Sequence, residues 1–192
     1  MGLDICVYRV QKPGPFESKV FNKEELLDQG YCLIPRPDRY ENLVRDLRPY
    51  TQEVLVRTAY LNMEAVRKDY GLSEQAYACE WLGDGRIGIF DPEPEDNRHI
   101  TLTSEEIAEK YTVYEDEQTL VFLREEVAYW RKHYGIQNFF YNALDDVENT
   151  GYYLLSEDVL AQFNAAAVEK GWNSLPVEAP TDDAALFYWE WY

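Results

Sequence analysis

The sequence predicts an α+β fold, in which short β-hairpins and mixed strands form a sheet that packs against four to six helices. Three observations lead to this class. Apolar residues alternate with others over residues 3–8, which is the period of a strand with one buried face. Helix-start signals recur, as at Ser156, and an Asp-Gly turn within residues 83–85 separates two apolar runs. With 192 residues, 46% of them apolar, the chain suits one compact domain over residues 1–192.

The first half of the chain marks its helices by their start and stop residues. Asn22 as N-cap with Glu25 at the third helical position predicts a helix, which Gly30 ends. A second start signal at Asp38 predicts a helix that stops before Pro49. The pattern then predicts a strand at 53–58 and a helix at 62–70.

The second half alternates predicted hairpins and helices. We expect hairpins at 76–90 and at 111–123, with a proline-containing loop over 91–98 and a short helix from Thr103 between them. The longest helix is predicted to begin near Glu125 and to run past Trp130 towards Tyr141. A short strand at 151–155, a helix at 156–170, a polar linker at 176–183 and an aromatic tail at 184–192 complete the chain.

A short echo in the sequence points to an internal duplication. Arg67-Lys68-Asp69-Tyr70-Gly71-Leu72 matches Arg131-Lys132-His133-Tyr134-Gly135-Ile136 at an offset of 64 residues. Each copy is predicted to lie near the end of a strand–helix unit, so the candidate repeat units are residues 53–118 and 119–171. A chance match of so few residues is the alternative.

The net charge of −18 lies mostly in two segments, residues 91–118 and 143–192. Such a surface repels phosphate, which argues against direct binding to nucleic acid or to anionic lipid. A basic protein partner is easier to accommodate, and solubility alone is the alternative explanation. The candidate binding carboxylates within the two segments are Glu93, Glu95, Asp96, Asp145, Asp146 and Glu148. Solvated acidic loops without a ligand are the alternative for both groups.

The cysteines and histidines predict neither a metal site nor a cofactor. Cys6, Cys32 and Cys79 are far apart, which favours buried free thiols over a disulfide or a zinc site. No apolar run is long enough to span a membrane, and the first residues lack the basic start of a secretory signal. We therefore expect a cytoplasmic protein.

Two motifs suggest chemistry, and both have simpler explanations. Gly83, Gly85 and Gly88 match the spacing of a dinucleotide-binding loop, but the residues that follow predict a strand where that loop requires a helix. His133 would share a helical face with Tyr129 and Trp130, and Glu126 would lie two turns back and could orient a general base. A half-buried histidine beside aromatic rings is the alternative, and no catalytic residue is assigned.

The tail Leu186–Tyr192 is the most unusual segment, because five of its seven residues are aromatic. Phe187, Trp189 and Trp191 alternate with the other residues, which predicts a strand packed back at a sheet edge. If the tail is instead exposed, these three rings form a candidate contact surface.

Two parts of the chain resemble a group of phage and prophage proteins of unknown function. One is the opening Met1-Gly2-Leu3-Asp4-Ile5 with Val7-Tyr8. The other is Glu125-Glu126-Val127-Ala128-Tyr129-Trp130-Arg131-Lys132, with Ile136, Phe139-Phe140, Asp145-Asp146 and Gly151-Tyr152-Tyr153 after it. Together they cover about 40 of the 192 residues, and Tyr134 stands where similar proteins carry Asn. The resemblance implies a phage-related origin and supplies no activity.

These observations favour a non-enzymatic acidic binding protein. We expect a phage protein that inhibits or occupies a host protein, such as a defence protein or one with a basic nucleic-acid-binding surface, in the manner of a DNA mimic. Two alternatives stay open: a small enzyme that uses His133 with Glu126 or with the acids at 145–148, and a structural oligomer assembled through the aromatic tail. The sequence leaves the partner and the oligomeric state open.

Overall fold

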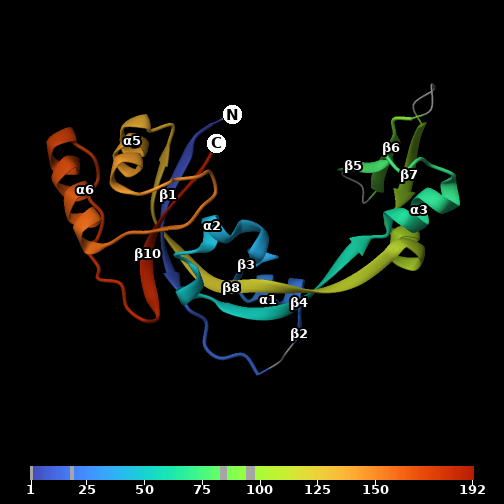
Figure 1. Cartoon of the computed structure of the whole chain (residues 1–192), viewed down its shortest axis with the longest axis horizontal. Helices are drawn as coiled ribbons and strands as arrows, with labels where there is room; N and C mark the ends of the chain where they lie inside the picture. Colours follow the sequence, from blue (N-terminus) through green and yellow to red (C-terminus); the bar gives the residue numbers. More distant parts are fainter. Residues whose placement is uncertain (1, 18–19, 83–85, 94–97) are drawn as a thin grey trace. The chain divides into compact units, whose positions relative to one another are not determined.

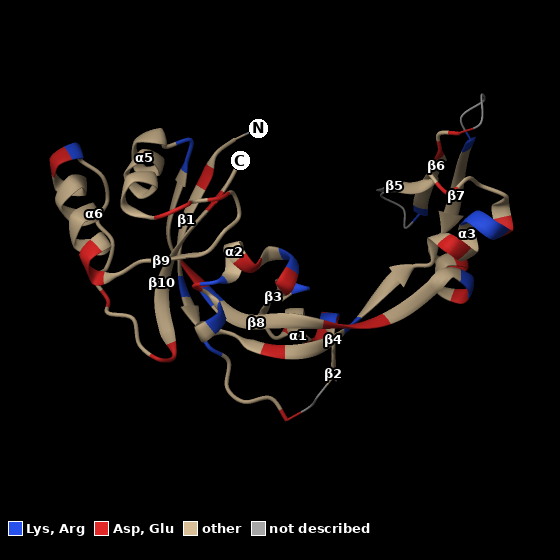
Figure 2. Ribbon diagram, viewed as in Figure 1, with Lys and Arg blue, Asp and Glu red and all other residues tan. Residues whose placement is uncertain are grey.

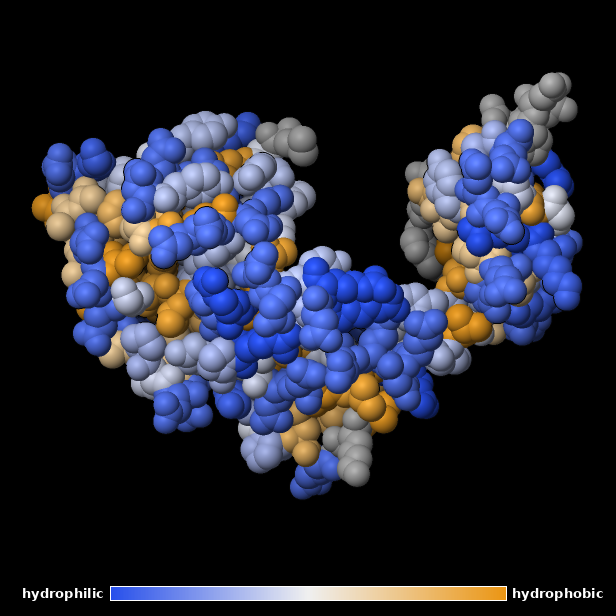
Figure 3. All heavy atoms as spheres, viewed as in Figure 1, coloured by the Kyte–Doolittle hydropathy of each residue, from blue (hydrophilic) through white to orange (hydrophobic). Residues whose placement is uncertain are grey.

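The α+β class is confirmed by the computed structural model, which describes residues 2–17, 20–82, 86–93 and 98–192 (Figure 1). The chain divides into two compact units. Unit 1 consists of residues 1–56 and 117–192, and unit 2 of residues 57–116. Unit 2 covers nearly the same residues as the candidate repeat at 53–118. Each unit has a hydrophilic surface interrupted by smaller apolar areas (Figure 3).

Unit 1 is built on a sheet whose strands are hydrogen-bonded in the order β2-β4-β8-β1-β10-β9, with β3 also paired to β8. β1 lies in the middle and pairs in antiparallel fashion with β8 on one side and β10 on the other. The strands are β1 (Asp4–Gln11), β2 (Val20–Asn22), β3 (Cys32–Pro35), β4 (Gln52–Leu61), β8 (Thr112–Arg131), β9 (Tyr153–Leu154) and β10 (Ala184–Trp191). β4 and β8 continue into unit 2.

Both faces of this sheet are covered. Ile5 and Val7 of β1 face a core that includes residues of helices α5 (Tyr134–Ala143) and α6 (Glu157–Lys170), which lie on one side of β1 and β10 (Figure 1). Tyr8 faces a second core. Because successive side chains of a strand point to opposite faces, a strand that is covered on both faces is apolar at consecutive positions.

The helix α6 confirms its prediction almost residue by residue. The Ser156 hydroxyl accepts the Val159 N–H (3.3 Å), and Gly171 ends the helix with a φ of 70°. Leu160 and Phe163 are fully buried. Every signal for this helix lies within its own sequence, so nothing distant is needed to predict it.

The short helices near the N-terminus are only partly as predicted. α1 (Lys23–Asp28) forms at the expected place, but the Asn22 side chain makes no capping bond. The predicted helix from Asp38 is broken into the 3₁₀ turns η1 (Pro37–Tyr40) and η2 (Arg48–Tyr50) around the single turn α2 (Glu41–Val44).

The predicted hairpin at 111–123 is wrong, and so is the first part of the long helix predicted from Glu125 towards Tyr141, which is helical only from Tyr134. Residues 112–131 form one continuous strand, β8, and the helix α5 begins only at Tyr134. The β1 strand explains the difference, because Asp4–Tyr8 offers backbone partners to residues 126–131. The two segments therefore form neighbouring strands.

Unit 2 contains a three-stranded antiparallel sheet in the order β5-β6-β7 (Figure 1). Its elements are α3 (Met63–Tyr70), β5 (Tyr77–Leu82), β6 (Arg86–Asp91), β7 (Arg98–Thr103), α4 (Ser104–Glu106) and the π-helical turn η3 (Ile107–Tyr111). The predicted helix at 62–70, the strand pair at 76–90 and the Thr103–Glu106 capping box are confirmed. The β7 strand was not predicted, and the turn at 83–85 lies outside the described residues.

The two copies of the sequence echo adopt different structures. Arg67–Gly71 forms the end of a helix, whereas Arg131 ends a strand and Tyr134 begins a helix. The matching residues therefore occupy unlike positions in their local elements.

Candidate functional site

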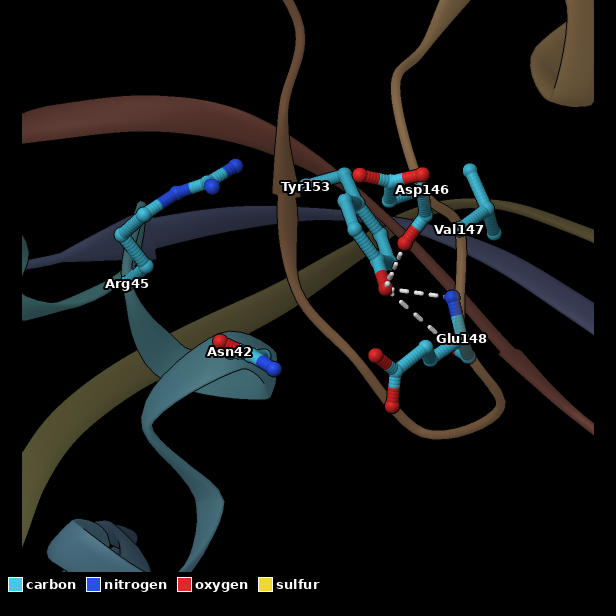
Figure 4. Close-up of a pocket in the computed structure, with 6 residues that line it drawn as sticks. All are labelled: Asn42, Arg45, Asp146, Val147, Glu148 and Tyr153. Carbon is cyan, nitrogen blue, oxygen red and sulfur yellow. Dashed lines mark hydrogen bonds between the residues drawn. The ribbon is translucent and has the colours of Figure 1, made fainter.

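Two of the predicted acidic residues, Asp146 and Glu148, line a cavity of about 350 Å³ in unit 1 (Figure 4). They belong to the loop that connects α5 to β9. The other residues around the cavity are Asn42, Arg45, Val147 and Tyr153. Asp145 lies in the same loop and is exposed, but it does not line the cavity.

Tyr153 holds the loop in place through its hydroxyl group. Its hydroxyl accepts the Glu148 N–H (2.5 Å) and lies within hydrogen-bonding distance of the Asp146 carbonyl oxygen (3.2 Å) (Figure 4). Burial is the main cause that raises the pKa of Tyr153. The hydroxyl therefore stays protonated at neutral pH and can donate as well as accept.

The close approach of Tyr153 depends on Gly151. A Cβ atom at position 151 would lie 2.6 Å from the Tyr153 hydroxyl oxygen, far inside a van der Waals contact. Asp146 itself has a φ of 48°, which is uncommon for a residue with a side chain. The loop geometry therefore needs a glycine near its end and a tyrosine two residues later.

The opposite wall of the cavity belongs to the single-turn helix α2. The Tyr152 N–H donates to the Leu43 carbonyl oxygen (2.9 Å), and the Leu154 N–H to Asp46 Oδ2 (3.4 Å), so both walls are fixed to each other. Arg45 bonds Asp46 (3.2 Å), and this bond is the main cause that raises the pKa of Arg45. The attraction of Asp146 contributes in the same direction.

The cavity thus has two exposed carboxylates on one wall and, on the other, an amide and a guanidinium that is already engaged by Asp46. Ionised carboxylates only accept hydrogen bonds, and their strongest partners are ammonium and guanidinium groups. The Asp146 and Glu148 carboxylates lie on either side of the Tyr153 hydroxyl (Figure 4), and each can accept a hydrogen bond from a Lys or Arg side chain.

The remaining predicted acids lie elsewhere. Glu93 is in unit 2, just after β6, where its N–H donates to Asp91 Oδ1 (3.3 Å) and its side chain is exposed. Glu95 and Asp96 lie outside the described residues. The acidic positions are marked along the ribbon of each unit in Figure 2. The predicted carboxylates therefore belong to two separate units.

The aromatic tail packs back as the strand β10, as predicted, but it does not lie at a sheet edge, because β1 and β9 flank it. Phe187 is fully buried, Trp189 is half-buried, and Trp191 is 54% exposed. A partner can reach Trp191, whereas the Phe187 ring is part of the core.

The helical face predicted for His133, Tyr129 and Glu126 does not exist. Glu126 lies in β8 opposite Tyr8, and His133 is the N-cap of α5, where its Nδ1 accepts the Ile136 N–H (3.2 Å). The His133 ring also packs edge-on against Trp172 at 5.4 Å. These contacts give His133 a structural role at the helix start.

The thiols differ from the prediction that all three are buried. Cys6 is buried, Cys32 is half-buried and Cys79 is exposed, and all three are free. Burial raises the pKa of Cys6 and of Cys32. Neither is therefore activated as a thiolate.

Several residues of the site were missed from the sequence, namely Asn42, Arg45 and Tyr153. Only Tyr153 had a visible signal, since it follows Gly151 in a predicted strand. Outside the cavity, the sequence also carried no signal for Glu190, a fully buried carboxylate in β10. It accepts hydrogen bonds from Tyr141 (2.5 Å), Tyr188 (2.6 Å) and Gln137 (3.0 Å).

Among the described residues, no three His, Cys, Asp or Glu side chains come together in the way that a metal ion requires. Likewise, no helix in the described part of the chain has the length and apolar character needed to cross a membrane. No family model, no curated protein and no solved structure matches this chain.

Proposed function

We propose that this chain is a non-enzymatic acidic binding protein of phage origin, which occupies or inhibits a host protein in the cytoplasm. The partner is a defence protein or a protein that handles nucleic acid, and it presents Lys and Arg side chains. Carboxylates of this chain take the place of nucleic-acid phosphates on the partner's basic surface.

One observation carries this proposal. Asp146 and Glu148 are exposed at a preformed cavity, and the hydroxyl of Tyr153 holds their loop. A loop that is held in one conformation presents its carboxylates to a cationic side chain at a smaller entropic cost than a mobile loop does. The net charge of −18 adds attraction at longer range, and the resemblance to phage proteins supports the origin.

The test begins with the full chain as bait in a host lysate, followed by measurements on the isolated partner. Neutralising Asp145, Asp146 and Glu148 to Asn, Asn and Gln should weaken binding at least about 10-fold, mainly through a slower association rate. Its matched control replaces Glu169, Asp182 and Asp183, three exposed acids of unit 1, by the corresponding amides. The control removes the same charge and should lose much less affinity.

Two further measurements separate charge from geometry. Binding should weaken steeply with salt, because exposed charges are screened beyond about 8 Å at physiological ionic strength, and DNA should compete for the partner. Tyr153→Phe keeps every carboxylate but removes the hydroxyl that holds Glu148, so we expect a smaller loss of affinity with little change in salt dependence. Binding that survives half-molar salt and ignores the three amides would contradict the proposal.

A further inference from the structure

Three rings form a row across the sheet of unit 2. Tyr77 of β5 pairs with Phe90 of β6, and Phe90 pairs with His99 of β7. The Tyr77 and Phe90 ring centroids are 5.7 Å apart at 77°, and those of Phe90 and His99 are 5.0 Å apart at 46°. The rings are thus in contact along a line that crosses all three strands.

The row lies on the face of the sheet that points away from the core of unit 2. Ile87 and Ile89 alternate with Phe90 along β6, and they pack with Val66 of α3 on the opposite face. Tyr77 is 50% exposed, His99 is exposed and Phe90 is half-buried. In Figure 1, α3 accompanies the three strands on one side only.

The space next to the row on the same face is filled by Cys79. Gly88 precedes Phe90 by two residues and therefore lies on the same face, opposite Thr101 of β7. A Cβ atom at Gly88 would lie 3.0 Å from Cys79 Sγ, which bonds the Gly88 carbonyl oxygen (3.1 Å). The Cys79 side chain therefore occupies the space over Gly88, and a planar group reaches the row at Tyr77 and His99, whose side chains are exposed.

The charge of unit 2 selects the kind of partner. Residues 57–116 contain 14 acidic and 6 basic residues. Several of the basic groups are engaged within the unit: Arg57 bonds Asp116, while Arg67 and Arg98 bond backbone carbonyl oxygens. Exposed rings on a sheet can stack with nucleobases, but an excess of carboxylates repels the phosphates that accompany them. The same excess of carboxylates attracts a cationic group, such as the side chain of Arg or Lys.

We propose that this ring row is a docking surface for an arginine-bearing segment of a basic protein partner. A guanidinium group is planar and weakly hydrated, so it stacks on aromatic faces and also pairs with carboxylates, whereas a lysine ammonium is compact and strongly hydrated. The proposal rests on the proposed function only for the basic character of the partner. It adds a contact on unit 2 that depends on ring stacking and not on the cavity of unit 1.

The experiment uses the full chain and two labelled peptides of equal charge, octa-arginine and octa-lysine, with fluorescence anisotropy at low salt. We expect octa-arginine to bind about 5-fold more tightly than octa-lysine, because only its side chains stack. Tyr77→Ser should remove most of this preference. Tyr114→Ser is the matched control, since Tyr114 is an exposed tyrosine of unit 2 outside the row, and it should preserve the preference.

A second variant protects the test against a folding defect. Phe90→Leu keeps an apolar side chain on the strand but removes the ring, and it should also reduce the preference for arginine. Amide exchange of β5, β6 and β7 verifies that each variant is folded. Equal binding of the two peptides, no binding of octa-arginine, or an unchanged preference in Tyr77→Ser overturns the proposal.

The remaining outcomes distinguish this proposal from the proposed function. The variant with amides at 145, 146 and 148 should keep its preference for arginine over lysine, even if it loses affinity for the host partner. Binding of single-stranded oligo(dT) that Tyr77→Ser abolishes would identify the row as a platform for bases and overturn the protein-docking proposal. If the amides at 145, 146 and 148 leave the affinity for the host partner unchanged while the protein still prefers octa-arginine, the proposed function alone is contradicted.

Discussion

The two sheets of this protein use aromatic residues in opposite ways. In unit 1, both faces of the sheet are covered, and the rings of Tyr188 and Phe187 point into different cores although they are adjacent in sequence. In unit 2, one face of the sheet packs on α3, and the other face carries the exposed row that includes Tyr77. The aromatic residues of this chain therefore serve two purposes: some fill the cores of unit 1, and others form an exposed surface on unit 2.

The difference shows that burial, and not composition, decides what a ring can do. A fully buried Phe or Tyr stabilises the fold through the area it removes from water. A ring on an uncovered sheet face adds little stability and remains available for a partner. Substitutions that are matched in kind but placed on covered and uncovered surfaces test this contrast directly.

The largest effect is expected at the covered face. Leu160→Asp places an unpaired charge among fully buried residues of α6 and should cost at least about 4 kcal/mol of unfolding free energy. Val168→Asp is the control, because Val168 lies on the same helix and is 81% exposed. Circular dichroism during thermal unfolding measures both. A Leu160→Asp protein with the normal melting temperature would show that this face of α6 is not covered.

A second effect concerns Glu190, the fully buried carboxylate of β10. Glu190→Leu leaves the donors of Tyr141, Tyr188 and Gln137 without their acceptor and should cost about 3 kcal/mol. Burial, followed by the bond to Glu190, raises the pKa of both tyrosines, so they stay protonated donors.

Urea unfolding measures this cost, and Glu169→Leu, an exposed acid on α6, should change stability by no more than about 0.5 kcal/mol. If Glu190→Leu is as stable as this control, the hydrogen bonds from Tyr141 and Gln137 do not hold β10 against α5.

A smaller effect in unit 2 depends on pH. The Ser73 hydroxyl donates to Asp91 (2.5 Å), and this bond is the main cause that lowers the pKa of Asp91. A carboxyl group with a lowered pKa in the folded state contributes stability above its unfolded pKa, about 4, and loses it as the pH falls through the folded value.

Ser73→Ala should therefore destabilise unit 2 at pH 7, and its deficit relative to the unchanged protein should shrink below about pH 4. Amide exchange of β6 reports unit 2 alone. A deficit that stays constant from pH 7 to pH 3 would mean that the serine acts through packing and not through the Asp91 charge.

The smallest effect is expected on the uncovered face. Tyr77→Ser should change the unfolding free energy by no more than about 0.5 kcal/mol, because half of its side chain already contacts water. Phe187→Ser, which removes a fully buried ring from unit 1, should cost several kcal/mol. Similar losses in the two variants, measured by chemical denaturation, would remove the contrast between the two sheets.

The sequence alone determined the elements whose signals are local. α6 has its N-cap, its apolar stripe and its terminal glycine within residues 156–171, and α3 and the Thr103–Glu106 box are equally self-contained. The β5–β6 pair was predicted from two apolar runs on either side of an Asp-Gly sequence. In each case the deciding interactions join residues a few positions apart, which a pattern in the sequence can show.

Only the tertiary structure decided the segment at 125–131 and the candidate site. Residues 125–131 contain good helix formers, but pairing with β1 turns them into a strand, with Trp130 and Tyr129 on opposite faces. Asn42 and Arg45 line the same cavity as Asp146 and Tyr153, which are more than 100 residues away in the chain. The Tyr152 N–H bond to the Leu43 carbonyl oxygen and the Leu154 N–H bond to Asp46 join the two segments. The acids at 145–148 could be named from the sequence because charge is a local property. Their cavity could not, because its opposite wall is brought there by contacts that no local pattern encodes.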